Sequence, residues 1–170
     1  MLVHHASVAS GGTPAIVHLE RAGVAFTVHE FRHEPGSRNY GLMAAEAIGV
    51  DPDRVFKTLV ATVEGLPGDA HVVAIVPVSA QLSLRSLAAA VGAKRAEMCP
   101  PAAAERLTGY VVGGISPFGQ RKRLRTVLDE MSILHDTIFV SGGKRGLDVE
   151  VAPDELARLL DAVVAPIAAP

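Results

Sequence analysis

Two apolar runs separated by a glycine–proline turn constrain this chain more than any other feature. Residues 55–63 (VFKTLVATV) are apolar except for two threonines and one lysine, and residues 72–78 (VVAIVPV) contain no polar side chain. Runs of this length without polar alternation are typical of strands that are buried on both faces. The segment 65–68 (GLPG) between them has the composition of a turn. The two runs therefore predict a buried hairpin.

The rest of the chain alternates between helical and extended patterns. Segments that begin at a capping residue, such as Thr13 or Ser83, and end at glycine predict helices. The predicted helices are 13–22, 39–48, 84–91, 101–107 and 153–160; the further strands are 24–31, 110–112, 126–128, 138–140 and 147–151, with an edge strand at 163–164 and a turn over 141–146. No regular strand–helix–strand rhythm is present, so we expect an α+β fold with a mixed, mostly antiparallel central sheet flanked by helices. Residues 1–12 are expected to form a flexible N-terminal tail, and residues 13–170 a single domain.

Composition limits the classes of function. The 170 residues suffice for one domain with a sizeable core, and the net charge is only -2, so nucleic-acid binding must come from local clusters of cations. Aromatic residues are sparse at 4%, which argues against a stacking platform for single strands. A single cysteine, Cys99, excludes an internal disulfide framework and fits a reducing compartment. No apolar run is long enough to cross a bilayer, so we expect a cytoplasmic protein without a membrane partner.

A glycine-rich segment, residues 109–119 (GYVVGGISPFG), precedes the densest basic run, residues 120–125 (QRKRLR). Gly113 and Gly114 remove two successive side chains, so the backbone N–H groups can approach a ligand closely. A bare loop followed by cations suits a polyanionic ligand with a carbonyl or phosphate in the loop. The alternative is a tight turn beside a solvated basic face.

Lys57 and Asp148 are charged residues within apolar strands. An unpaired buried charge is costly, so each must reach a partner, a ligand or solvent. The two side chains are candidate partners for each other, although spacing alone does not establish this. The other reading is that Lys57 extends its ammonium group to the surface.

Several familiar sites are excluded by their spacing. Residues 114–120 lack the lysine of a phosphate-binding loop, and residues 114–119 have one residue too many for a serine nucleophile elbow. His29 and His33 lie in a strand and loop context rather than on a metal-binding helix, and no zinc set is present. Cys99 has no neighbouring base and is interpreted as a small apolar residue. We therefore expect neither a metal nor a cofactor.

Taken together, four blocks of sequence resemble the YbaK family of editing aminoacyl-tRNA deacylases, which is related to the insertion domain of bacterial prolyl-tRNA synthetases. The blocks are residues 55–59 (VFKTL), 77–82 (PVSAQL), 107–117 (LTGYVVGGISP) and 140–148 (VSGGKRGLD). They occur in the family's order and the resemblance covers nearly the whole chain. It implies hydrolysis of the ester that joins cysteine to the 3′ end of proline tRNA. This ester forms when prolyl-tRNA synthetase attaches cysteine by mistake. Alternatives are removal of alanine or another small amino acid from proline tRNA, or a non-catalytic module that binds tRNA or a synthetase.

The resemblance also implies roles for individual residues. Lys57 matches the essential lysine of the family, and no protein nucleophile is implied, because the thiol of the substrate attacks its own ester. The catalytic group is then Lys57, Thr58, Gly113, Gly114 and Asp148; the substrate-binding group is Phe31, Tyr40, Ile115, Ser116, Ser141 and Gly142; and the tRNA-binding group is Arg121, Lys122, Arg123, Lys144 and Arg145. The family often has Tyr at the position of Phe31 and Phe at that of Tyr40, so either the phenol has moved across one pocket or the amino-acid preference differs. The implied partners are the acceptor end of proline tRNA and, as a candidate, prolyl-tRNA synthetase; no DNA partner is implied.

Overall fold

The computed structural model describes residues 12–34, 39–68 and 70–170. The predicted N-terminal tail therefore lies almost entirely outside the described residues. The elements, in chain order, are α1 (Pro14–Ala22), β1 (Phe26–Glu30), α2 (Tyr40–Ile48), the 3₁₀ turn η1 (Pro52–Arg54), β2 (Phe56–Glu64), β3 (His71–Pro77), β4 (Gln81–Leu82), α3 (Leu84–Val91), β5 (Arg95–Met98), α4 (Pro101–Thr108), β6 (Arg125–Asp129), the 3₁₀ turn η2 (Glu130–Leu134), β7 (Ile138–Lys144), β8 (Leu147–Val151), α5 (Pro153–Leu160), β9 (Val163–Ala165) and β10 (Ala168–Ala169). Among the described residues, no helix is long and apolar enough to span a membrane.

The predicted hairpin forms the centre of a five-stranded sheet. β2 and β3 pair antiparallel without a break from Phe56–Pro77 to Thr62–His71. The strand order is β5-β2-β3-β6-β9, with β5 antiparallel to β2 and with β3, β6 and β9 mutually parallel. The sheet is therefore mixed, as predicted.

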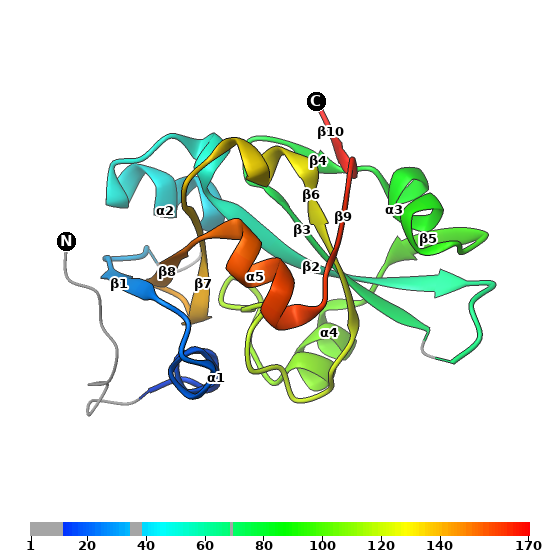
Figure 1. The fold of residues 1–170 in the computed structure, drawn as a ribbon, viewed down its shortest axis with the longest axis horizontal. Coiled ribbons are helices and arrows are strands. Elements are labelled where there is room, and N and C mark those ends of the chain that lie inside the picture. The colour runs from blue at the N-terminus through cyan, green and yellow to red at the C-terminus, as the bar shows by residue number, and fades with distance from the viewer. Residues whose placement is uncertain (1–11, 35–38, 69) are drawn as a thin grey trace.

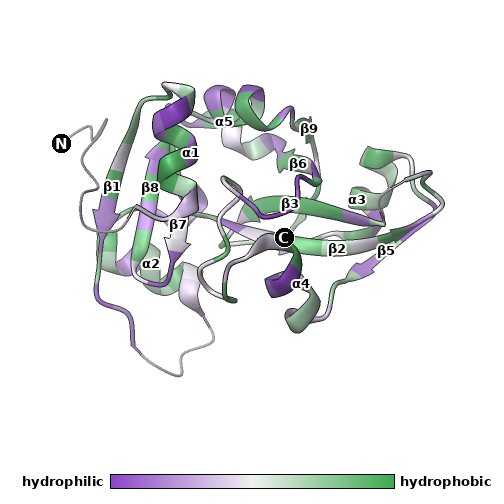
Figure 2. Cartoon of the chain, turned by 90° about the horizontal axis from the view of Figure 1, so that it is seen from below, coloured by the Kyte–Doolittle hydropathy of each residue, from purple (hydrophilic) through white to green (hydrophobic). Residues whose placement is uncertain are grey.

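Alternate residues of β3 pack on opposite sides of the sheet, which explains its uninterrupted apolar sequence. Val72, Ala74 and Val76 pack with α3, whereas Val73 and Ile75 belong to a larger cluster that includes residues of α1, α4 and α5. Figure 2 shows β3 in the hydrophobic colour along most of its length. A strand that is buried on both faces has no position at which a polar side chain would be solvated.

A second, three-stranded antiparallel sheet has the order β1-β8-β7, and a short two-stranded sheet joins β10 to β4. Figure 1 shows the three-stranded sheet with α1 and α2 at one end of the molecule and α3 at the other. An isolated parallel bridge between Val55 and Phe139 links the two larger sheets. Of the seven strand pairings in the described chain, five are antiparallel, which confirms the predicted α+β class.

The predicted helix ends are confirmed by their capping contacts. The Thr13 hydroxyl accepts a hydrogen bond from the Ile16 N–H, and the Ser83 hydroxyl accepts one from the Ser86 N–H. Gly23, Gly49, Gly92 and Gly109 adopt left-handed conformations at the four C-termini where glycine was expected. These contacts satisfy terminal backbone groups that a helix cannot satisfy internally.

Two local predictions are wrong. Residues 110–112 form no strand; instead the Tyr110 side chain is buried and its hydroxyl donates to the Phe118 carbonyl at 2.6 Å. The predicted turn over 141–146 is mostly strand, because β7 continues to Lys144 across a register shift that begins at Ser141. β4, β5 and β10 were not predicted, because they are short and lack a continuous apolar pattern.

Candidate active site

A cavity of about 300 Å³ borders the bridge between the two larger sheets and runs along β2. It brings together segments that lie far apart in the sequence: β2, the start of α2, the glycine-rich segment, and the facing ends of β7 and β8. Nine of the sixteen predicted site residues line it: Phe31, Tyr40, Lys57, Thr58, Gly113, Ile115, Ser141, Arg145 and Asp148. Gly114, Ser116, Gly142, Arg121, Lys122, Arg123 and Lys144 do not line it.

Lys57 is half-buried in the cavity wall. Burial lowers the pKa of its ammonium group below the ordinary value. No ion pair or hydrogen bond to this ammonium group is found within the described part of the chain. The lysine is therefore not paired with Asp148, although both residues border the same cavity. An unpaired, half-desolvated cation is available for an anionic group of a ligand.

Asp148 lies in β8, the central strand of the three-stranded sheet, opposite His29 on one side and Ser141 on the other. Its side chain is buried, with 7% exposed, and burial raises the pKa of its carboxyl group from 3.8 to about 7. No hydrogen bond or ion pair satisfies it within the described residues. Desolvation disfavours the ionised form, and no neighbouring donor offsets this effect.

β2 has an unpaired backbone edge beside the cavity. The Val55 carbonyl and the Val63 N–H both bond toward β3. Because backbone groups of alternate residues point to opposite edges of a strand, those of Thr58 and Val60 point away from β3. The Val60 carbonyl accepts the Cys99 N–H at 3.0 Å, which confirms this alternation.

Pairing with β5 stops before it reaches Thr58. The last paired residue is Ala61, opposite Met98, and Cys99 is followed by Pro100 and Pro101, which have no N–H to donate. The edge of β2 at Thr58 therefore borders the cavity instead of another strand of the described chain. The Thr58 hydroxyl is also buried without a hydrogen-bonding partner there.

Gly113 and Gly114 each exclude a side chain, but for different structural reasons. At Gly113, which has φ +89°, an added Cβ would lie 2.5 Å from Cδ2 of Tyr40. At Gly114, a Cβ would lie 2.8 Å from the backbone of Lys144. The Gly114 N–H donates to the Val111 carbonyl at 2.8 Å, so this N–H is already used in a turn. Of the pair, Gly113 is the residue that reaches the cavity.

Tyr40 and Arg145 stack at the border of the cavity. The guanidinium carbon of Arg145 lies 4.7 Å from the centre of the Tyr40 ring, within the range of a cation–π contact. The Arg145 Nε donates to the Val112 carbonyl at 2.9 Å. Arg145 thus joins the β7–β8 turn to the glycine-rich segment and holds Tyr40 against Gly113.

Ser116 and Gly142 lie outside the cavity and support the segments that form its wall. Ser116 is fully buried, and its hydroxyl accepts the Phe118 N–H at 3.2 Å. The Gly142 carbonyl accepts a hydrogen bond from the Thr13 hydroxyl, which ties β7 to the start of α1. Neither residue reaches the cavity.

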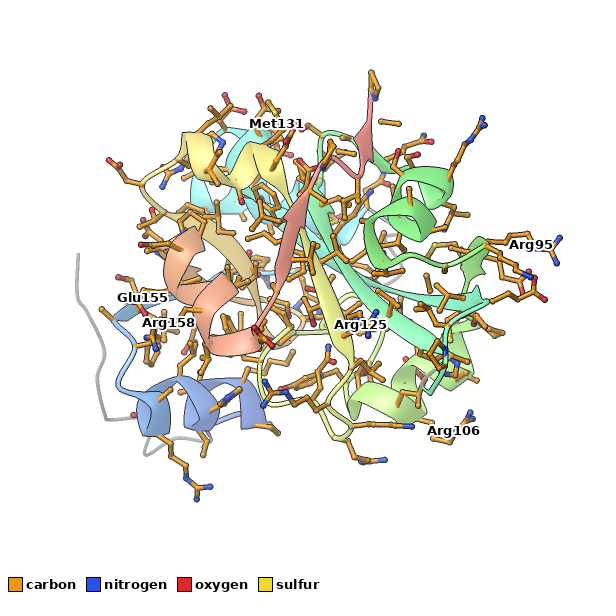
Figure 3. The ribbon with its side chains drawn as sticks, turned by 45° about the vertical axis from the view of Figure 1, so that its right-hand side comes forward. Arg95, Arg106, Arg125, Met131, Glu155 and Arg158 are labelled. Carbon is orange, nitrogen blue, oxygen red and sulfur yellow. The ribbon has the colours of Figure 1, made fainter. Side chains whose placement is uncertain are left out.

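The predicted tRNA-binding cations are exposed, apart from the partly buried Arg145. In the basic run, Arg121 donates to the Arg106 carbonyl at 3.4 Å, and Arg125 donates to the Val91 carbonyl at the end of α3. Figure 3 shows Arg106 extending away from α4. These contacts anchor part of the run to helix C-termini, where cations are favoured.

Cys99 belongs to the cavity wall, which sequence reasoning missed. It is buried, as expected for a small apolar residue, and burial raises the pKa of its thiol. Met43, Met98, His33 and Ala104 also line the cavity. The double proline after Cys99 was the sequence signal for this position, because it ends strand pairing beside β2.

Within the described ranges, no group of three or more His, Cys, Asp or Glu side chains is placed to hold a metal ion.

The family model and the similar proteins all point to the same family. The model of the aminoacyl-tRNA editing domain matches residues 42–159. A protein of Enterococcus faecalis, named as the Cys-tRNA(Pro)/Cys-tRNA(Cys) deacylase EbsC, is 42% identical over 123 residues, which cover 72% of this chain and 73% of that protein. The multifunctional Ser/Thr-tRNA deacylase ProXp-y of Escherichia coli is 39% identical over 75 residues, 44% of this chain and 45% of its own length.

The fold agrees with these matches. A solved structure described as a trans-editing enzyme for prolyl-tRNA synthetase superposes with a TM-score of 0.79 and 26% identity, covering 92% of this chain and 96% of that one. The family-model match, residues 42–159, includes the β2–β3 hairpin, the glycine-rich segment and the β7–β8 turn, which all border the cavity. The chain belongs to the aminoacyl-tRNA editing domain family.

Proposed function

We propose that this protein is a trans-acting deacylase that hydrolyses the ester of Cys-tRNA(Pro) in the cytoplasm. The observation that carries the proposal is that Lys57, Thr58, Gly113 and Asp148 border the same cavity. A volume of about 300 Å³ fits a small aminoacyl group and part of the terminal ribose, at the lower end of small-molecule sites. The E. faecalis relative, named as a Cys-tRNA deacylase, supports cysteine as the amino acid.

The cavity favours a mechanism without a protein nucleophile. Cys99 is the one thiol of the chain, and its pKa is raised rather than lowered, which disfavours the reactive thiolate. Ser116 is fully buried behind the loop. A cysteinyl ester carries its own thiol close to the carbonyl carbon, so attack within the substrate gains the advantage of proximity.

In this reaction the substrate sulfur bonds to the carbonyl carbon, and the bond from that carbon to the 3′ oxygen of the tRNA breaks. The proton lost by the substrate thiol goes to the released 3′ oxygen of the tRNA, and water then opens the cyclic thioester to give free cysteine. In this mechanism the N–H of Gly113, which borders the cavity, stabilises the oxyanion that forms on the carbonyl oxygen. Lys57 supplies positive charge either to the terminal phosphate or to the same oxyanion.

The exposed cations hold the acceptor stem through its phosphates. Residues 121–123 and Lys144 provide charge outside the cavity, while Arg145 lies at its border. Prolyl-tRNA synthetase is the candidate partner that would deliver mischarged proline tRNA. Phosphate contacts of this kind position a tRNA without reading its sequence.

A second candidate is deacylation of another small aminoacyl group. The Ser/Thr-tRNA deacylase relative and the exchanged aromatic positions, Phe31 and Tyr40, favour it, since both aromatic rings line the cavity. A direct test is deacylation of Cys-tRNA(Pro), Ala-tRNA(Pro), Ser-tRNA and Pro-tRNA(Pro) by the purified protein. Preferential turnover of Cys-tRNA(Pro) supports the proposal, and faster turnover of Ala-tRNA(Pro) or Ser-tRNA supports the second candidate. Binding of tRNA without turnover of any ester would instead identify a non-catalytic module.

A further inference from the structure

Asp148 is an unsatisfied acid in the wall of the cavity. It is the one carboxylate among the described residues that line this space, and its side chain is 7% exposed. The cationic residues of the same wall, Lys57 and Arg145, form no ion pair with it. A buried carboxylate without a partner is costly and is stabilised when a cation enters beside it.

The other buried acids among the described residues, Asp129 and Glu150, show that this situation is specific to the cavity. Asp129 accepts the N–H groups of Ile167 and Ala168 at 2.9 Å and that of Met131 at 3.0 Å. Glu150, two residues from Asp148 on the same face of β8, contacts the His29 ring at 2.9 Å and the Arg54 guanidinium at 3.5 Å. The fold therefore satisfies its structural acids internally and leaves Asp148 open to the cavity.

The unpaired edge of β2 at Thr58 supplies a further acceptor to the same space. The Thr58 carbonyl points away from β3 by the strand alternation, and Thr58 lines the cavity. A backbone carbonyl and a carboxylate are both acceptors. Their common complement is a small cation with several N–H donors, such as an ammonium group.

We infer that Asp148 and the Thr58 carbonyl bind the α-ammonium group of the aminoacyl end, so that the site distinguishes free aminoacyl-tRNA from N-acylated and peptidyl-tRNA. This inference rests on the proposed deacylase function and adds the chemical group by which the substrate is recognised. The α-amino group is present on every aminoacyl-tRNA whatever its side chain. Recognition here is therefore independent of the amino acid removed. Because a bound ammonium group favours the ionised carboxylate, binding would also reverse the raised pKa of Asp148.

The test compares esters that differ only at the α-position. The aminoacyl-tRNA that the protein hydrolyses fastest is measured beside an α-hydroxyacyl-tRNA with the same side chain and beside its N-acetyl form. Each rate is divided by the spontaneous hydrolysis rate of that ester. We expect kcat/KM to be roughly 10- to 100-fold higher for the free amine, the magnitude of a hydrogen bond to a charged group. The Asp148→Asn variant is expected to remove most of this preference, because it slows the amine substrate more than the hydroxyl substrate.

Glu150→Gln is the matched control, because it removes a carboxylate from the same face of the same strand outside the cavity. It is expected to keep the preference for the amine. Equal normalised rates for the amine and hydroxyl esters in the wild-type protein would overturn the inference, as would an unchanged preference in Asp148→Asn.

A binding experiment separates this inference from the proposed function. Calorimetric titration uses two stable amides, 3′-alanylamino-3′-deoxyadenosine and its lactoyl counterpart, which carries a hydroxyl in place of the amine. Tighter binding of the amine form, lost in Asp148→Asn, supports the inference even if no aminoacyl-tRNA is hydrolysed. Turnover of aminoacyl-tRNA with equal affinity for both amides would support the deacylase function and refute the inference.

Discussion

Replacing Asp148 by asparagine should stabilise the protein at neutral and alkaline pH. Burial raises the pKa of this carboxyl group from 3.8 to about 7, so between these values the folded state holds a proton that the unfolded chain has lost. The free energy of unfolding therefore decreases as the pH rises through this window, and the full penalty is present above pH 7. At about 1.4 kcal/mol per pKa unit, the penalty has an upper limit of about 4 kcal/mol. Asparagine keeps the shape of the side chain and cannot ionise.

The assay is urea unfolding of wild-type protein and Asp148→Asn at pH 4, 6 and 8, without ligand. The two proteins should have similar free energies of unfolding at pH 4, and the variant should be the more stable by roughly 2–4 kcal/mol at pH 8. Glu150→Gln should show the opposite behaviour. Burial alone would raise the pKa of Glu150, but the hydrogen bonds from Thr137 and His29 and the charge of Arg54 hold this pKa below its usual range. The ionised Glu150 carboxylate therefore stabilises the fold above that range, and this contribution is lost as the pH falls. An Asp148→Asn curve parallel to wild type at all three pH values would refute the assignment of an unsatisfied buried acid.

Four further predictions address the remaining parts of the site. Lys57→Ala should lower the deacylation rate by about 10²–10³-fold with the circular dichroism spectrum unchanged, the cost of losing one electrostatic stabiliser; near-normal turnover would exclude a catalytic role. Gly113→Ala should reduce activity more than Gly92→Ala, because both glycines have positive φ but only the first has Tyr40 within 2.5 Å of the added Cβ; equal losses would show that backbone strain alone matters. Replacing residues 121–123 with alanine should weaken tRNA binding and reduce its salt dependence, measured by filter binding between 50 and 200 mM salt. If the affinity of the variant and of the wild type falls equally with salt, these residues do not contact tRNA. Cys99→Ala should keep substantial activity, whereas abolished turnover in a folded variant would point to this thiol as a nucleophile.

The local rules of the sequence accounted for most elements of the fold. Continuous apolar runs identified β2 and β3, because a strand buried on both faces excludes polar side chains. Glycines and capping residues fixed the helix ends, since these depend on contacts within a few residues. The extension of β7 to Lys144 was missed, because its glycines have the local signature of a turn. The strand continues only because Ser141 and Lys144, on either side of them, pair with β8 across a register shift.

Of the site, the sequence determined which residues carry unusual chemistry, and the tertiary structure decided which of them meet. A lysine and an aspartate within apolar strands were identifiable from the cost of burying charge, and both line the cavity. The packing of β8 against β1 and β7 decides that Lys57 and Asp148 do not pair with each other. It also decides that Glu150, two residues from Asp148, contacts His29. The open edge of β2 and the place of Cys99 in the cavity wall likewise follow from where β5 stops pairing. The double proline after Cys99 is a local signal for the end of this pairing. Which side chains then meet in the cavity is decided by contacts between residues distant in the chain.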